Sequence, residues 1–132
     1  MIRRLRKGEH GQALVEMALV LPLFLLLLFG VMEMGLVGFA YISVSNAAGA
    51  GGRMATIGGT NTQIYTATKN AATSLNLEDE NVTITPTLIS QRYSGQEVTV
   101  QVTYSVQLII PIISNVIPNP VVVRSIVIMR LE

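Results

Sequence analysis

The 132-residue sequence contains no cysteine, a single histidine, His10, and only 13% charged residues. Without cysteine, neither a disulfide nor a thiolate metal site can support the fold. If the chain is cut after Gly11, as argued below, the mature protein loses its histidine too. A His-based triad, a thiol nucleophile and a histidine-ligated metal are then excluded. We therefore expect no catalytic residue, no metal ion and no cofactor.

Other ligand sites are also poorly supported. Glycines cluster at positions 49–59, but no Gly-Lys-Ser/Thr follows them and no strand precedes them, which argues against a phosphate loop. The run Glu78-Asp79-Glu80 lacks the alternating acids and the glycine of a calcium loop, so we interpret it as a solvated turn. The basic residues before Gly11 have no aromatic or further basic neighbours, and we expect no nucleic-acid binding.

Half of the sequence is apolar, and its longest apolar run extends from Met17 to Met32. As a helix, Gly11 to Met32 is about 33 Å long, enough to cross a hydrocarbon core of about 30 Å. Four basic residues precede the run: Arg3, Arg4, Arg6 and Lys7. By the positive-inside rule, the N-terminus lies in the cytoplasm and the chain after about Tyr41 lies outside. The sequence therefore predicts a single-pass protein of the cytoplasmic membrane.

A basic segment before an apolar core is also typical of a secretory signal peptide. The apolar character resumes after Glu33, however, and no convincing A-x-A cleavage site follows the first run. Glu16, at the head of the run, would contribute nothing to a signal core. These features favour a membrane anchor.

The anchor contains residues that a plain anchor does not need. An ionisable group costs a few kcal/mol near the centre of a membrane helix and less near the interface, so Glu16 suggests packing against a neighbouring subunit. Glu33 lies about 25 Å further along the helix, where it serves either as a carboxylate at the headgroup level or in packing. Pro22 removes one backbone hydrogen bond and predicts a kink or local loosening.

Beyond Gly35 the helical pattern continues to Ile57. One apolar face is predicted, formed by Val37, Tyr41, Val44, Ala48 and Ala55. We expect the helix to fray at Gly49, Gly51 and Gly52, and to end at Gly58-Gly59. A second helix begins at Thr60 or Asn61. Its predicted buried stripe consists of Ile64, Ala67, Thr68, Ala71 and Leu75.

After Asn81 the period changes to two, which is typical of strands. We predict an edge strand starting at Val82 and shortened by Pro86, a hairpin turn at Ser94-Gly95, and strands over Val98–Leu108 and Val121–Arg130. The loop between the last two strands is very apolar at residues 108–118. It either packs in the core or contacts lipid or a partner subunit.

The elements together predict an α+β fold, in which a long N-terminal helix packs on an antiparallel sheet of three or four strands. The expected domains are a basic leader at 1–11, which is cleaved, a transmembrane helix at 12–34, and an extracytoplasmic domain at 35–132.

Several motifs resemble the TadE family of pseudopilins from tight-adherence pilus systems. Gly11-Gln12-Ala13-Leu14-Val15-Glu16 resembles a prepilin-peptidase site that is cut after the glycine. The apolar stretch around Pro22 and the exit Glu33-Met34-Gly35 are similar to the family pattern, as is the small-residue helix that ends in Gly51-Gly52-Arg53. The closing residues 129–132 match more weakly.

The resemblance implies a pilin-like fold and a minor pseudopilin in the assembly of a type IV-like tight-adherence (Flp) pilus. It also implies processing after Gly11, so that the new amine of Gln12 can pair with Glu16 of a neighbour. The implied partners are a prepilin peptidase, other pilin and pseudopilin subunits, membrane lipid and an inner-membrane assembly platform. Residues expected to pack between subunits are Glu16, Pro22, Glu33, Gly35 and Arg53. Two alternatives remain: an uncleaved, membrane-anchored extracytoplasmic binding module and, less favoured, a membrane enzyme.

Overall fold

The computed structural model describes the chain from Arg6 to Glu132, with side chains from Gly11 onward. The chain forms two compact units, one ending at Met34 and the other comprising Gly35–Glu132. Helix α1 (Arg6–Thr56) contributes to both. The predicted basic leader therefore lies partly outside the described residues.

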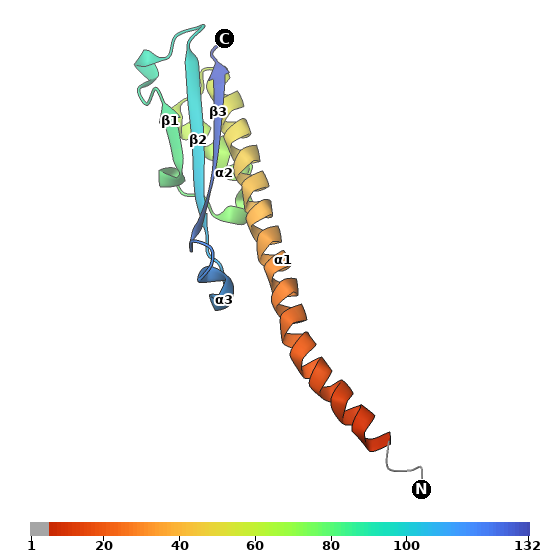
Figure 1. The fold of residues 1–132 in the computed structure, drawn as a ribbon. Coiled ribbons are helices and arrows are strands. Elements are labelled where there is room, and N and C mark those ends of the chain that lie inside the picture. The colour runs from red at the N-terminus through yellow and green to blue at the C-terminus, as the bar shows by residue number, and fades with distance from the viewer. Residues whose placement is uncertain (1–5) are drawn as a thin grey trace. The chain divides into compact units, whose positions relative to one another are not determined.

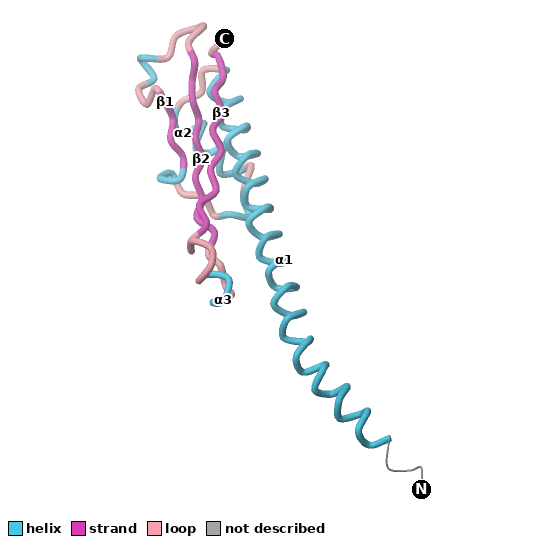
Figure 2. Tube along the Cα trace, viewed as in Figure 1, coloured by secondary structure: helices cyan, strands magenta, loops and turns pink. Residues whose placement is uncertain are grey.

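The second unit is an α+β structure built on one antiparallel sheet of three strands in the order β1-β2-β3 (Figure 1). The strands are β1 (Val82–Thr85), β2 (Glu97–Val106) and β3 (Val121–Arg130). Two shorter helices accompany them, α2 (Asn61–Asn70) and α3 (Pro111–Ser114). Figure 2 shows α3 within the connection between β2 and β3. The predicted fold class and the bounds of the last strand are confirmed.

Helix α2 starts where a capping box predicts it. The Thr60 side chain accepts a hydrogen bond from the backbone of Gln63, whose side chain accepts one from the backbone of Thr60. The predicted stripe is correct for Ile64 and Thr68, which are fully buried, and wrong for Ala71, which is exposed. The reason is that α2 ends at Asn70 and a 3-10 turn follows, which turns Ala72 toward the core instead.

Strand β1 lies at one edge of the sheet and ends directly before Pro86. Proline has no N–H to donate to a strand ladder, which explains both features. The connection between β1 and β2 covers residues 86–96, so the predicted turn at Ser94-Gly95 is only its last part. Gly95 does form a turn, at φ +84, and its N–H donates to Leu131 O at 2.8 Å. The turn is thus joined to the end of β3.

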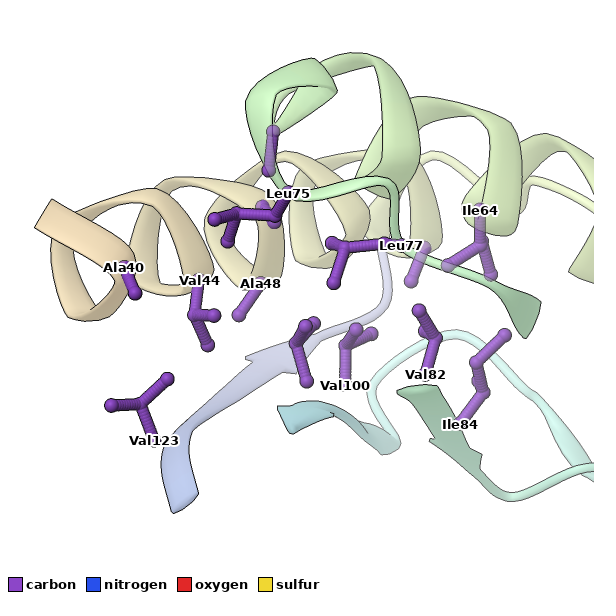
Figure 3. Packing of buried hydrophobic residues seen from close by; sticks show 14 of the residues in the cluster. Ala40, Val44, Ala48, Ile64, Leu75, Leu77, Val82, Ile84, Val100 and Val123 are labelled. Carbon is purple, nitrogen blue, oxygen red and sulfur yellow. The ribbon is translucent and has the colours of Figure 1, made fainter. Parts of the chain in front are cut away.

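The core lies between the sheet and the helices on one of its faces (Figure 3). Val98, Val100 and Val102 of β2 are almost fully buried, in agreement with their predicted alternation. The part of α1 that belongs to this unit contributes small side chains, and Figure 3 shows Val44 and Ala48 pointing toward the sheet. Small residues allow the helix to approach the strands closely.

The predicted fraying of α1 is wrong, because the helix continues without interruption to Thr56. A Cβ at Gly51 would lie 3.1 Å from Val100 Cγ1, and one at Gly52 would lie 3.0 Å from Val127 Cγ1. Both glycines therefore lie against the sheet. Packing of this kind offsets the low helix propensity of glycine, which is unfavourable by about 1 kcal/mol per residue relative to alanine.

The predicted apolar face of α1 needs one further correction. Tyr41 is 55% exposed, whereas Ser43, which was not assigned to that face, is buried. Val44, Ala48 and Ala55 are buried as predicted, and the buried stripe also includes Ala40 and Ala47.

Candidate functional site

The motif Gly11 to Glu16 lies entirely within helix α1. Gly11, Gln12 and Glu16 are exposed. Since Gln12 and Glu16 are four residues apart, they lie on the same side of the helix, one turn from each other. A Cβ at Gly11 would meet no atom within 4 Å, so packing within this chain does not require a glycine there.

An apolar surface follows this motif along the helix. Its side chains are exposed to solvent in the single chain. The exposed fractions of Leu14, Leu19 and Leu23 are 72%, 73% and 69%. By length and composition, α1 is suited to cross a membrane. Apolar side chains exposed over such a length are stabilised only when lipid or other apolar surfaces cover them.

Pro22 lies within the apolar surface, and α1 continues on both sides of it. Because proline lacks an N–H, the carbonyl of Ala18 loses its partner one turn earlier. In hydrocarbon such a group needs another donor, which neighbouring helices often supply in membrane proteins. The position is therefore compatible with the predicted packing role, which the single chain does not test.

Glu16 and Glu33 differ in exposure. Glu16 is exposed, whereas Glu33 is 6% exposed. Both readings of Glu33, a carboxylate at the headgroup level and a packing role, stay predictions.

The remaining candidates, Gly35 and Arg53, are exposed residues of the second unit. A Cβ at Gly35 would meet nothing within 4 Å. Arg53 lies in the last turn of α1, where a positive charge interacts favourably with the helix dipole. The seven predicted residues thus lie along a single helix and do not surround a common cavity.

Sequence reasoning missed the importance of Gly51 and Gly52. In the structure, Gly51 faces Ile64 and Thr68 of α2 as well as β2. The sequence does contain a signal for this packing, namely small residues with the spacing of a single helical face: Val44, Ala48, Gly51 and Ala55. The glycines were treated as helix breakers when they belong to a stripe of small residues.

Within the described part of the chain, no three His, Cys, Asp or Glu side chains lie close enough to hold a metal ion. Two clefts in the second unit are open to solvent. One, of about 420 Å³, lies between Met54 and α2, and the other, of about 270 Å³, includes Leu36, Phe39 and Val106. Neither contains a charged residue. The most unusual feature of the molecule is therefore the surface of α1 itself.

A comparison with protein families also points to helix α1. The family model described as TadE-like protein matches residues 11–53. This segment is TadE-like. It begins at Gly11 and ends at Arg53, so all seven site candidates lie inside it. No curated protein and no solved structure matches the chain.

The TadE-like segment confirms the family resemblance inferred from the motifs. The match suggests a role in a tight-adherence pilus system that includes interaction with other pilus subunits. The apolar helix suggests a single-pass membrane anchor.

Proposed function

We propose that the protein is a minor pseudopilin that takes part in the assembly of a tight-adherence (Flp) pilus. The observation that supports this most is the exposed Glu16 at the head of an exposed apolar helix within the TadE-like segment. In this proposal α1 first anchors the chain in the cytoplasmic membrane, with the N-terminus in the cytoplasm. It then packs among the helices of other pilin and pseudopilin subunits, at an inner-membrane assembly platform.

Glu16 gains a charge partner by processing. A prepilin peptidase that cuts after Gly11 creates a positively charged amine on Gln12. In a bundle of helices this amine pairs with Glu16 of a neighbouring subunit and offsets the cost of removing the carboxylate from water. Pairing within one chain is also geometrically possible, because the two residues are one helical turn apart.

The local sequence assists the cut. Gly11 lies inside α1, and a peptidase needs an extended backbone at the bond it cleaves. A glycine in a helix interior is less favourable than alanine by about 1 kcal/mol, so this turn unwinds more easily than its neighbours. Gln12 adds a condition, since an N-terminal glutamine can cyclise to a neutral lactam by losing ammonia. Cyclisation would remove the positive charge that Glu16 requires.

Co-expression with a prepilin peptidase, followed by intact-mass measurement, tests the proposal. We expect a chain that starts at Gln12, and the same measurement shows whether ammonia has been lost. Gly11→Ala should block processing. Gly35→Ala is the matched control, because Gly35 is another exposed glycine of α1 without neighbours around its Cβ position.

An unchanged mass, with Gly11→Ala making no difference, would contradict processing. That result would favour the alternative function, an uncleaved anchor that carries an extracytoplasmic binding module.

A further inference from the structure

One surface of the second unit is not explained by packing between subunits along α1. It is the apolar loop, defined as residues 108–118, which connects β2 to β3 and contains α3. Leu108 is buried, but Ile109 is 80%, Ile112 is 60% and Val116 is 83% exposed. The predicted core packing is thus correct only for the first residue of the loop.

The apolar loop lies at the end of the second unit where α1 enters it. Strand β2 ends at Val106 and β3 begins at Val121, and Figure 1 places α3 beyond these strand ends. Val106 and Gln107 share a cleft with Leu36 and Phe39, which belong to the first two turns of α1 within this unit. The loop is therefore close to the point from which the chain continues into the apolar helix.

Charge is absent from both segments that meet at this end. No Asp, Glu, Lys or Arg occurs at residues 34–52 or 98–123. The outer face of β3 provides a contrast: Ile126 and Ile128 are exposed there too, but Arg124 and Arg130 lie on the same face. A charged group is expensive in hydrocarbon, so only the loop end of the unit is suited to contact the acyl chains of a bilayer.

Part of the backbone of the apolar loop is bonded internally, which lowers the cost of moving it into lipid. The N–H groups of Ile113 and Ser114 both donate to Ile110 O at 3.1 Å, and those of Val116 and Ile117 donate to Ile113 O at 3.0 Å. Prolines at 111, 118 and 120 have no N–H to satisfy.

The neck of the loop is closed by one side chain. The amide of Asn119 accepts from Leu108 N at 3.0 Å and donates to Leu108 O at 3.3 Å. The two ends of the loop are thus held together, with Ile109, Ile112 and Ile117 exposed.

We propose that the apolar loop inserts into the leaflet of the bilayer next to the second unit and forms a second lipid contact besides α1. The inference rests on the proposed membrane anchoring by α1. Two contacts with one bilayer would restrict the orientation of the second unit before assembly. Tyr41, which is exposed at the same end of the unit, is suited to the headgroup level, where tyrosine is enriched.

The absence of cysteine makes a direct test possible, because a single introduced cysteine can be labelled specifically. The full chain is reconstituted in phosphatidylcholine vesicles that contain lipids with a nitroxide quencher on the acyl chain. An environment-sensitive fluorophore is attached to Ile112→Cys, Ile128→Cys or Leu19→Cys. Ile112 and Ile128 are both isoleucines with 60% exposure, so they form a matched pair, and Leu19 reports the apolar helix.

We expect quenching at positions 112 and 19 and none at position 128, at every protein-to-lipid ratio. Quenching at 19 without quenching at 112 would overturn the inference and leave the anchor intact. No quenching at 19 would overturn the anchor and the inference together. The fluorophore at position 112 could instead be shielded from water without being quenched, to an extent that increases with protein density. That result would identify another subunit as the occupant and would also overturn the inference.

Discussion

Gly51 leaves no space for a side chain. A Cβ at this position would overlap Thr68 Oγ1 and lie 3.1 Å from Val100 Cγ1. The Thr68 side chain cannot easily turn away, because its hydroxyl donates to Ile64 O at 2.8 Å in a fully buried environment. The helix thus touches α2 and β2 through a residue without a side chain.

We predict that Gly51→Ala lowers the free energy of unfolding by about 2 kcal/mol, the typical cost of overpacking a rigid core. Urea unfolding of the full chain in detergent, followed by tyrosine fluorescence, measures the change. Gly38→Ala is the matched control, because a Cβ there meets nothing within 4 Å. It should be neutral or stabilise the helix by up to about 1 kcal/mol. Equal effects of the two substitutions would contradict the packing argument.

Arg92 joins the β1–β2 connection to the start of α2. Its Nε and Nη2 donate to Pro86 O at 2.9 and 2.8 Å, and Nη2 also donates to the side chain of Asn61 at 2.5 Å. Burial lowers the pKa of Arg92, and the charge interaction with Tyr65 raises it in part. The guanidinium joins the two segments because it donates to both of them.

We predict that Arg92→Ala lowers the free energy of unfolding by about 2 kcal/mol, since hydrogen bonds from charged donors contribute about 1.5–3 kcal/mol. Arg92→Lys should recover only part of the loss, because an ammonium lacks the planar fork of the guanidinium. Arg124→Ala, on the exposed face of β3, should change the free energy of unfolding by no more than about 0.5 kcal/mol. The same urea measurement ranks the stabilities of the three variants. Full recovery of stability by Arg92→Lys would contradict the argument from the planar guanidinium.

At the scale of elements, α2 depends on its first turn. It has ten residues, which is marginal for an isolated helix, and it is stabilised by its capping box and by Ile64 in the core. It covers the part of the core next to β1, where Figure 3 shows Ile64 near Val82 and Ile84. Weakening α2 therefore weakens the edge of the sheet.

Thr60→Ala removes the cap acceptor and should cost about 1 kcal/mol of stability. Thr62→Ala, two residues further on and exposed, is the control and should be neutral or slightly stabilising, because alanine is the better helix former. Thermal unfolding of the full chain in detergent, followed by circular dichroism, compares the two. A loss that is no larger for Thr60→Ala than for Thr62→Ala would argue against the capping box.

At the scale of the whole molecule, the proposed function separates insertion from assembly. Insertion depends on the apolar surface of α1, to which Glu16 adds nothing favourable. Assembly depends on the pairing of Glu16 with the amine of a neighbour. A substitution at Glu16 should therefore affect the two processes differently.

We predict that Glu16→Leu leaves the amount of protein in the membrane fraction unchanged and reduces the yield of sheared surface pili. Glu80→Leu, in an exposed turn of the second unit, is the matched control and should affect neither. Immunoblots of the membrane and pilus fractions measure both quantities. A normal pilus yield with Glu16→Leu would show that the carboxylate is not needed for assembly.

Much of this architecture could be predicted from local patterns. The alternation of Val98, Val100 and Val102 indicates β2, and the last strand was predicted with its observed bounds. Thr60 marks the start of α2, and the motifs between Gly11 and Arg53 indicate the family. Each of these signals depends only on neighbours along the chain, because helix and strand periodicities and cap geometry are set within a few residues.

Long-range packing decided the rest. Gly51 and Gly52 look like helix breakers until α2 and β3 are placed against them, and Ser43 and Tyr41 exchange their expected environments for the same reason. Likewise, the sequence leaves open whether the apolar loop packs in the core or contacts lipid or a partner subunit, and the tertiary structure exposes most of it. Periodicity identifies an apolar face, but the size of the side chains that fit there depends on the surface packed against it.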